Sequence, residues 1–398
     1  MNRHVFLSAG SIVLGVLAAR SGGKGYLLHK LNPKGPRSQD VNLSSEQPEK
    51  SAVFRIYPDL SRHIPWLSLV DIPTPVEEIG TSLGMPEGKL WVKRDDLTSN
   101  VYGGNKVRKQ EHLLADATLR GRKSLITLGG LGSNHSMATA VHGSRSGFEV
   151  HLCLIDQPVS KYVRQNLSGF LAAGAKIHYC SSLKDAYMYS RSLFRQLKRE
   201  GRAPYFIPPG GTCGLSNVGH VNAALELAEQ IRQGLLPVPD KLFIPAGTCG
   251  TIAGLIAGLK IAGLPTRVVG VRVVNPMPAF SYLIRYYAQK VAEDLRKFDK
   301  SVPKVRIEKT DFELLTNYLG EGYGAITPEG KAAVERVAER ISLETTYTGK
   351  TLAACLDYCE KTEAEEKILF WNSYNSADFD KSPTYDGLPD EILEKLSL

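Results

Sequence analysis

The stretch KLFIPAGTCGTIAGLIAGLKI, residues 241–261, decides the fold. Its apolar start at 241–245 predicts a buried strand, and 251–261 predicts a helix. The small residues between them allow backbone N–H groups to converge on an anion at the positive end of the helix dipole. This turn is neither a Walker A loop nor a GxGxxG fingerprint. It predicts a phosphate cup, with a plain tight turn between strand and helix as the alternative.

The same order of strand and helix recurs from residue 52 onward. The predicted strands are 124–130, 149–155, 175–180, 205–207, 241–245, 267–274 and 367–371. The predicted helices are 106–119, 135–144, 162–173, 186–200, 218–233, 251–261 and 328–343. This alternation is typical of an α/β fold with parallel sheets, whose ligands bind beyond the carboxyl ends of the strands.

Length and composition narrow the function classes. A chain of 398 residues predicts two to three domains, and 42% hydrophobic with 23% charged residues is ordinary for a globular protein. The net charge is +8, but residues 1–39 hold six basic residues and no acid, so the remainder is nearly neutral. We therefore expect no nucleic-acid binding by the folded part. The six cysteines form no CxxC pair, and we expect no metal site.

The N-terminal segment is uncharged over residues 5–19 and follows Arg3 and His4. Its length matches the hydrophobic region of a signal peptide, and as a helix it would span only about 22 Å. We expect a membrane anchor or export signal. The alternatives are an organellar transit peptide and a disordered extension of a cytoplasmic protein. Residues 31–50 have the composition of a linker.

Two further turns, each leading into a predicted helix, contain residues that can react with or bind a ligand. Gly103-Gly104-Asn105-Lys106 places a lysine at a helix start, where the dipole and burial both lower the pKa of an amine and make it a nucleophile toward carbonyls. The alternative is a solvated basic turn. Gly129 to Ser136 resembles a carboxylate cup, in which Ser133 or His135 handles a proton, and its alternative is a cluster of N-cap residues.

A phosphate cup, a reactive lysine and a carboxylate cup are the parts of a pyridoxal-phosphate enzyme. From about Ile72 to Trp371 the sequence resembles the family of D-cysteine desulfhydrases and 1-aminocyclopropane-1-carboxylate (ACC) deaminases. The resemblance rests on Lys93-Arg94-Asp95-Asp96, Gly103-Gly104-Asn105-Lys106 with Arg108-Lys109, Ser133-Asn134-His135, Pro209-Gly210-Gly211-Thr212 and Tyr347-Thr348-Gly349-Lys350.

The resemblance implies a two-domain, fold-type-II pyridoxal-phosphate enzyme, similar to the tryptophan synthase β subunit, with a parallel-sheet core and a smaller inserted α/β domain. We expect residues 52–108 and 220–398 to form the large cofactor-binding domain, residues 109–219 the small domain, and residues 1–51 the N-terminal segment and linker. We also expect a homodimer, with membrane association only through residues 5–19.

The resemblance also assigns roles to residues. Lys106 is the Schiff-base lysine, Asn134 contacts the ring hydroxyl, Tyr347 stacks on the pyridine ring and Ser373 faces the pyridine nitrogen. Ser133 holds the substrate carboxylate and assists proton transfer, and Tyr323 is a second active-site tyrosine. The phosphate is cradled by Gly247, Thr248, Cys249, Gly250 and Thr251. The residues expected to bind substrate are Ser133, Asn134, His135 and Thr348.

Two positions separate the branches of this family. ACC deaminases carry Glu after the stacking tyrosine and Leu at the pyridine-facing position, whereas this chain has Thr348 and Ser373, the pattern of the desulfhydrases. The expected function is β-elimination of D-cysteine to pyruvate, hydrogen sulfide and ammonia. The alternatives are an ACC deaminase, a lyase for another D-amino acid, and a non-catalytic binding protein. Tyr374-Asn375 replace the Gly-Gly usual in the family, which we expect to narrow the pocket or change the substrate.

Overall fold

The computed structural model describes residues 47–275, 280–363, 365–378 and 384–397. The predicted hydrophobic segment 5–19 lies outside these ranges, so its anchoring or targeting role stays a prediction. No helix within the described ranges is long and apolar enough to span a membrane.

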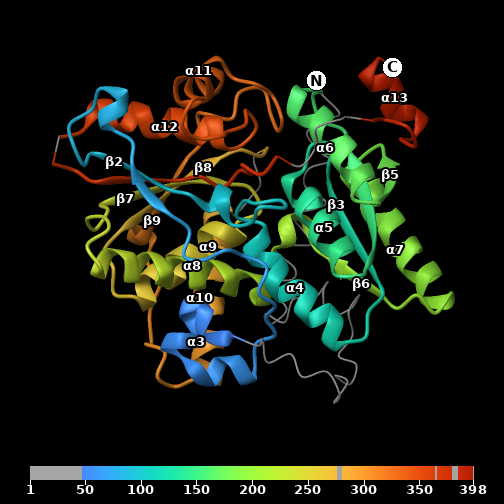
Figure 1. Cartoon of the computed structure of the whole chain (residues 1–398), viewed down its shortest axis with the longest axis horizontal. Helices are drawn as coiled ribbons and strands as arrows, with labels where there is room; N and C mark the ends of the chain where they lie inside the picture. Colours follow the sequence, from blue (N-terminus) through green and yellow to red (C-terminus); the bar gives the residue numbers. More distant parts are fainter. Residues whose placement is uncertain (1–46, 276–279, 364, 379–383, 398) are drawn as a thin grey trace.

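The described residues form two sheets, which lie side by side in Figure 1. The six-stranded sheet has the order β1-β2-β10-β7-β8-β9, and the four-stranded sheet has the order β5-β4-β3-β6. All neighbouring strands are parallel except β1 and β2. The larger sheet consists of β1 (Val76–Glu78), β2 (Leu90–Lys93), β7 (Lys241–Ala246), β8 (Arg267–Arg272), β9 (Phe312–Leu315) and β10 (Ile368–Trp371). The smaller consists of β3 (Ser124–Gly130), β4 (Glu149–Ile155), β5 (Lys176–Cys180) and β6 (Pro204–Ile207).

Helices cover both faces of each sheet. Against the larger sheet, α8, α9 and α10 pack on one face and α11 and α12 on the other (Figure 1). Against the smaller sheet, α4, α5 and α6 pack on one face and α7 on the other. The α-helices are α3 (Ala52–Ile56), α4 (Val107–Leu119), α5 (Asn134–Arg145), α6 (Lys161–Ala172), α7 (Leu183–Arg199), α8 (Gly214–Arg232), α9 (Gly250–Ile261), α10 (Phe280–Phe298), α11 (Pro328–Val337), α12 (Thr348–Lys361) and α13 (Asp390–Leu396).

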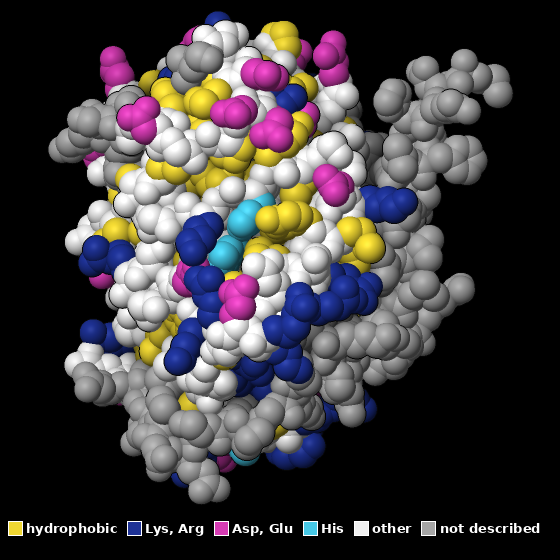
Figure 2. Space-filling model, turned by 90° about the vertical axis from the view of Figure 1, so that its right-hand side faces the viewer, with side chains coloured by type: hydrophobic (Ala, Val, Ile, Leu, Met, Phe, Trp, Pro, Cys, Tyr) yellow, Lys and Arg dark blue, Asp and Glu magenta, His cyan; other side chains and the backbone are white. Residues whose placement is uncertain are grey.

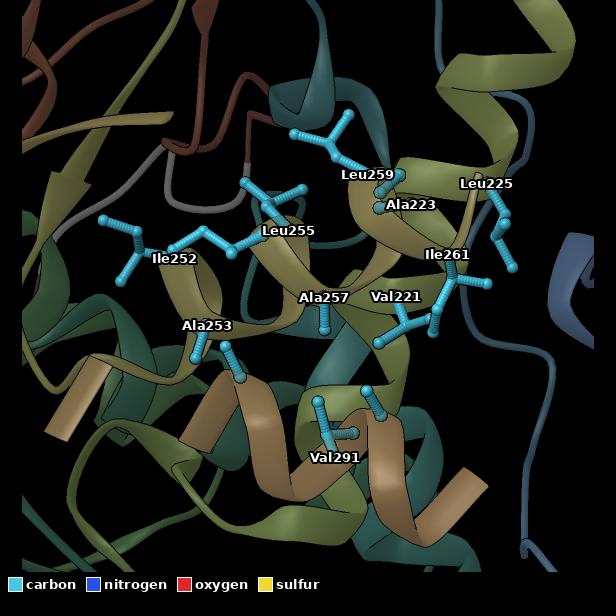
Figure 3. Packing of buried hydrophobic residues seen from close by; sticks show 14 of the residues in the cluster. Val221, Ala223, Leu225, Ile252, Ala253, Leu255, Ala257, Leu259, Ile261 and Val291 are labelled. Atoms are coloured by element: carbon cyan, nitrogen blue, oxygen red, sulfur yellow. The ribbon is translucent and has the colours of Figure 1, made fainter. Parts of the chain in front are cut away.

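The core beneath the larger sheet is built around α9. Figure 3 shows Ile252, Leu255 and Ala257 of α9 beside Val221 of α8, with Val291 of α10 below them. All five side chains are buried. The start of α9, where the phosphate cup was predicted, is therefore held by a well-packed core rather than by a free loop.

Charge is segregated on the side of the molecule that carries α7. In Figure 2, which looks onto that side, acidic side chains gather toward the top and basic ones across the middle and lower part. The basic residues of α7 are Lys184, Arg191, Arg195, Lys198 and Arg199. A nearly neutral folded part is thus compatible with strong local charge.

The α/β fold with parallel sheets is confirmed. Every predicted strand and helix is present, β3 and β4 with the predicted ends and the others with shifted ends. The prediction missed β1, β2 and β9, which are short, and the helices α3, α10, α12 and α13. The predicted helix 328–343 was too long: α11 ends at Val337, and the chain then turns and buries Ile341 and Leu343. The predicted domain boundaries fall inside α4 and α8, and the division itself stays a prediction, as does the homodimer.

Candidate active site

The loop that carries Lys106 is fixed by close backbone contacts. A Cβ on Gly103 would lie 2.2 Å from the Asp96 carbonyl oxygen, and one on Gly104 would lie 2.4 Å from that of Tyr374. Gly104 also has a φ of 94°, a conformation that favours glycine. The loop is therefore clamped between the segment after β2 and the segment after β10, and it delivers Lys106 to the N-cap of α4.

The Lys106 amine is available for chemistry. Its side chain keeps part of its surface accessible, yet the surrounding protein lowers the pKa of the amine to about 8 by burial. An amine with such a pKa is partly neutral near physiological pH and can attack a carbonyl. The structure thus supports the reactive lysine over the solvated basic turn.

The predicted phosphate cup lies at the start of α9. Cys249 occupies its N-cap in the left-handed region, at φ 67° and ψ −14°, and makes no side-chain capping bond. Such strain in a residue other than glycine is typical of functional sites. Thr248 Oγ1 lies 2.7 Å from Thr212 Oγ1, and Asn105 Nδ2 donates to Thr251 Oγ1 at 2.9 Å. Asn105 therefore links the lysine loop directly to the cup.

Lys109 also belongs to this cup, although the sequence analysis gave it no role. Its Nζ donates to Gly210 O at 2.9 Å and to Thr212 Oγ1 at 3.1 Å. Burial, and next the neighbouring Lys106, hold the pKa of Lys109 well below its usual value. A bound anion would favour its protonated form, so Lys109 fits a phosphate partner. Its position after Arg108 in the recognised motif was the available signal.

The polar groups around the start of α9 suit a phosphate group. A Cβ on Gly250 would lie 2.6–2.7 Å from three polar atoms, contributed by Lys109, Thr212 and Asn217. The Asn217 amide is fully buried and neither of its polar atoms has a partner among the described residues. A buried unpaired amide and a buried lysine beside an uncapped helix start fit the phosphate of a pyridoxal phosphate, and these residues would hold that group while Lys106 would bond its carbonyl.

The predicted carboxylate cup, at the start of α5, is partly used by the protein itself. Ser133 is the N-cap residue and its Oγ accepts from Ser136 N at 3.2 Å. Asn134 Oδ1 accepts from Asn166 Nδ2 at 3.1 Å and from Tyr102 Oη at 3.4 Å. The N-cap alternative therefore holds for Ser133, and its contact with substrate stays a prediction.

His135 does not present its ring as a free acid or base. Its Nε2 lies 2.9 Å from Thr127 Oγ1 on β3, and burial, followed by Lys106 and Lys109, holds its pKa well below the usual value. A neutral imidazole bonded to the sheet is poorly suited to exchanging protons with a substrate. The expectation that the His135 side chain handles a proton is therefore not supported, although its Nδ1 has no partner among the described residues. Its backbone N–H and Nδ1 are the groups that remain for a ligand.

Two predicted tyrosines meet. Tyr323 Oη and Tyr347 Oη are 2.6 Å apart, and Tyr323 lies beside Gly130, where a Cβ would be 2.9 Å from its ring. Burial raises the pKa of Tyr323 to about 12, so both hydroxyls stay protonated at neutral pH. The structure brings this pair to the end of β3, as a site between the two sheets requires.

Glu344 organises the start of α12 and was missed by the sequence analysis. Its carboxylate accepts from the backbone N–H groups of Thr346, Tyr347 and Thr348 at 2.6, 2.8 and 2.9 Å. Burial raises its pKa, while these hydrogen bonds oppose the rise. Glu344 thereby orients Tyr347. An acidic residue three positions before the N-cap residue Tyr347 was the signal.

Thr348 and Ser373, the two residues that separate the branches of the family, are both buried but have different hydrogen-bond partners. Thr348 Oγ1 accepts from Glu344 N at 2.9 Å, so its hydroxyl is bonded within the turn and its contact with substrate stays a prediction. Ser373 follows β10, and its carbonyl oxygen accepts from Asn105 N at 3.3 Å. Ser373 is therefore next to the lysine loop, as its expected role requires.

Tyr374 and Asn375 have separate roles. Asn375 Oδ1 accepts from Gly103 N at 2.5 Å, so Asn375 braces the lysine loop. Tyr374 is 8% exposed and packs edge-on against Tyr162, with ring centroids 5.9 Å apart. Both residues line a cavity of about 350 Å³, together with Tyr162 and Leu343. That they narrow the substrate pocket stays a prediction.

A buried network of ion pairs links the elements that carry the site residues. Arg108, two residues after Lys106, binds Asp95 and Glu226, with closest distances of 2.7 and 3.1 Å. Lys93 Nζ binds Glu226 at 2.5 Å, and Trp371 Nε1 donates to Asp95 at 2.8 Å. Two cations and two anions compensate each other through direct ion pairs. The network ties β2, α4, α8 and β10 together and fixes Lys106 relative to Ser373.

Comparisons with known proteins agree with this geometry. The family model of pyridoxal-phosphate-dependent enzymes matches residues 67–373. A Klebsiella pneumoniae D-cysteine desulfhydrase is 31% identical over 315 residues, which cover 77% of this chain and 92% of that protein. A Pyrococcus furiosus protein, provisionally named an ACC deaminase, is 33% identical over 310 residues, 77% of this chain and 90% of that protein.

A crystal structure of an ACC deaminase homologue superimposes with a TM-score of 0.70 at 29% identity, covering 87% of this chain and 98% of that one. The range matched by the family model, residues 67–373, contains Lys106, both cups and the strands that position them. The chain therefore belongs to the pyridoxal-phosphate-dependent enzymes, in the family of D-cysteine desulfhydrases and ACC deaminases.

Proposed function

We propose that this enzyme is a lyase that carries out β-elimination on D-cysteine, consuming water and releasing hydrogen sulfide, pyruvate and ammonia. The observation that carries the proposal is the pair of hydroxyl residues, Thr348 after Tyr347 and Ser373 after β10, where the resemblance places Glu and Leu in ACC deaminases. Similarity to several D-cysteine desulfhydrases supports it.

Lys106 is the residue that holds the cofactor and moves the proton. When bound, pyridoxal phosphate supplies a carbonyl for amines and an electron sink for the substrate α-carbon. The Lys106 amine, with a pKa that burial lowers to about 8, takes the α-proton as a general base. A hydroxyl rather than a carboxylate at Ser373 makes the sink weaker, which suffices when the leaving group is a thiol.

The two cups and the tyrosine pair divide the remaining tasks. The start of α5, at Ser133 to His135, binds the substrate carboxylate through backbone N–H groups. The Tyr323 and Tyr347 hydroxyls, 2.6 Å apart and both protonated at neutral pH, donate a proton to the departing sulfur. The Gly247–Thr251 turn anchors the phosphate and keeps the ring in place.

Tyr374 sets the size of the substrate in this proposal. Its buried ring follows Ser373 in the chain, packs on Tyr162 and lines the 350 Å³ cavity. A side chain as small as that of cysteine needs little of this space. A lyase for a larger D-amino acid is the second candidate, because a smaller residue at position 374 would enlarge the cavity.

The deciding experiment is a substrate panel. Purified enzyme is given D-cysteine, L-cysteine, larger D-amino acids with a β-leaving group, and ACC, while sulfide and keto acid are measured. We expect sulfide and pyruvate from D-cysteine and no keto acid from ACC. Efficient opening of ACC without turnover of D-cysteine would refute the argument from Thr348 and Ser373.

A paired variant tests the role of Tyr374. Tyr374→Gly should improve kcat/KM for larger D-amino acids relative to D-cysteine, whereas Tyr374→Phe should leave that ratio unchanged because the ring remains. Asn375→Gly is the matched comparison in the same segment. It should lower kcat for all substrates alike, since it loosens the loop of Lys106.

A further inference from the structure

The contact between α8 and α9 is unusually close, and it determines what reaches the phosphate cup. Gly250, Gly254 and Gly258 lie one turn apart along α9. A Cβ on Gly254 would be 2.5 Å from His220 Cβ, and one on Gly258 would be 2.6 Å from Ala224 Cβ. Figure 3 shows the two helices in contact along this part. The third glycine, Gly250, faces Asn217 of α8 in the same way.

Asn217 is therefore carried to the first turn of α9. The position that a Cβ on Gly250 would take lies 2.7 Å from Asn217 Oδ1, 2.7 Å from Lys109 Nζ and 2.6 Å from Thr212 Oγ1. These atoms come from α8, from α4 and from the segment before α8. Three separate elements thus direct polar groups at one point beside the open N-terminus of a helix.

The Asn217 side chain has no partner for either polar atom among the described residues, although its residue exposure is 0%. Leaving a buried amide unpaired is energetically costly, so such amides normally have a ligand or an ordered water. Lys109 and Thr212, by contrast, bind each other. Asn217 is thus the member of the cluster with unused hydrogen-bonding capacity.

We propose that Asn217 is a direct ligand of the cofactor phosphate, in addition to the Gly247–Thr251 turn. Its Nδ2 donates to a phosphate oxygen once the amide is turned by half a rotation about its last bond. A buried hydrogen bond to an anion is stronger than one between neutral groups. The inference rests on the cofactor and not on the substrate, so it stands or fails independently of the proposed lyase activity.

The experiment compares ligands with and without a phosphate group. The full chain is freed of cofactor with hydroxylamine, and dissociation constants are measured by tryptophan fluorescence for pyridoxal phosphate, inorganic phosphate and pyridoxal. Asn217→Ala should weaken binding of the two phosphate ligands about tenfold and leave pyridoxal unchanged. Asn217→Asp should weaken them about a hundredfold or more, because a carboxylate repels the phosphate.

Asn222→Asp is the matched control, since it places the same buried carboxylate on α8 away from the cup. Asn222 Oδ1 already accepts from Ser51 Oγ and Val53 N, which an aspartate can retain. We expect unchanged phosphate affinity in this variant. Asn217→Ser, which keeps a shorter donor, should give an intermediate affinity and serves if the alanine variant does not fold.

Two results would overturn the proposal. One is an Asn217→Ala or Asn217→Ser variant that binds pyridoxal phosphate and inorganic phosphate as tightly as the unchanged protein does, which would mean that a water satisfies the amide. The other is an equal loss for pyridoxal and pyridoxal phosphate, which would mean that Asn217 shapes the ring site or the fold rather than the phosphate site.

Discussion

The turns β3–α5 and β7–α9 are built from similar sequences, but the N-termini of the two helices they lead into are capped differently. Both run from a buried strand through glycines and hydroxyl residues into a helix. At β3–α5, Ser133 turns its own Oγ to the N–H of Ser136 and so caps the helix. At β7–α9, Cys249 is left-handed and caps nothing, while polar groups from α4 and α8 gather over Gly250.

The difference teaches how a helix start becomes an anion site. A helix capped by its own side chain has already satisfied part of its free N–H groups. A helix without such a cap keeps its dipole and its N–H groups for a ligand. The uncapped turn is therefore suited to a permanently bound phosphate, and the capped one to a substrate carboxylate that must leave again.

The largest expected effect comes from removing the amine that both turns surround. Lys106→Ala should lower kcat/KM by about a thousandfold or more and remove the visible absorbance of the bound cofactor, because no other group supplies the nucleophile. Lys106→Arg should fail too, since a guanidinium stays protonated. Lys350→Met is the matched control: burial also lowers the pKa of Lys350 to about 8, but its Nζ binds Leu319 O. Normal cofactor absorbance in Lys106→Ala would contradict the assignment.

The second prediction breaks the uncapped turn. Gly250→Ala should raise the dissociation constant of pyridoxal phosphate about a hundredfold, because its Cβ would lie 2.6–2.7 Å from three polar atoms. Gly247→Ala, in the same turn, should be tolerated, since the nearest atom to its Cβ is Val274 Cγ1 at 3.8 Å. Equilibrium dialysis measures both. Equal affinities in the two variants would show that the volume beside Gly250 is not reserved for the phosphate.

The third prediction concerns pH. A neutral amine is needed for attack on the cofactor carbonyl, so the rate of cofactor binding should rise about tenfold per pH unit below 8 and level off above it. Stopped-flow absorbance measures this rate. Burial is the cause of the lowered pKa, so a midpoint near 10.5, the value of an exposed lysine, would mean that Lys106 is not buried in solution.

The smallest effect distinguishes the capped turn. Ser133→Ala should lower the free energy of unfolding by about 1 kcal/mol through loss of the N-cap, whereas Cys249→Ala should change it less because no capping bond is lost. Urea titration of the two variants measures the difference. Ser133→Ala should also raise KM more than it lowers kcat, if the carboxylate binds at this turn.

Local patterns were predictable wherever neighbours in sequence are also neighbours in space. The strand-to-helix turns at 129–136 and 246–251 were identified because their glycines, hydroxyl residues and helix start are consecutive. The strands β1, β2 and β9 were missed because each is a run of only three or four residues that includes a charged side chain. The equally short β6 and β10 contain no charged residue and were predicted. The reactive amine of Lys106 was predictable from its place at a helix start.

Lys109 and Asn217 could not be assigned roles in the same way. Each acts on a group far away in the chain: Lys109 on Thr212, and Asn217 on the start of α9. Glu344 acts locally, on the N–H groups of residues 346–348, and was missed although its signal lay in its own turn. The sequence also predicted that Ser133 or His135 handles a proton, yet Nε2 of the His135 ring is bonded to Thr127. From sequence alone, a polar side chain is expected to contact groups in its own turn. Tertiary packing can instead place it against a group of another element.

The amino-acid sequence by itself determined the α/β alternation, the three turns, the lysine and, through its motifs, the family. These depend on backbone propensity, periodicity and residue order, which are local. Only the tertiary structure decided which turn is capped, that Asn375 braces the lysine loop while Tyr374 bounds a cavity, and that Asn217 reaches the cup. Those outcomes depend on how closely the glycines let α8 approach α9, and the segment after β10 approach the loop that carries Lys106. Such distances are set by packing between segments that are far apart in the chain: more than a hundred residues for the loop, and about thirty for the two helices.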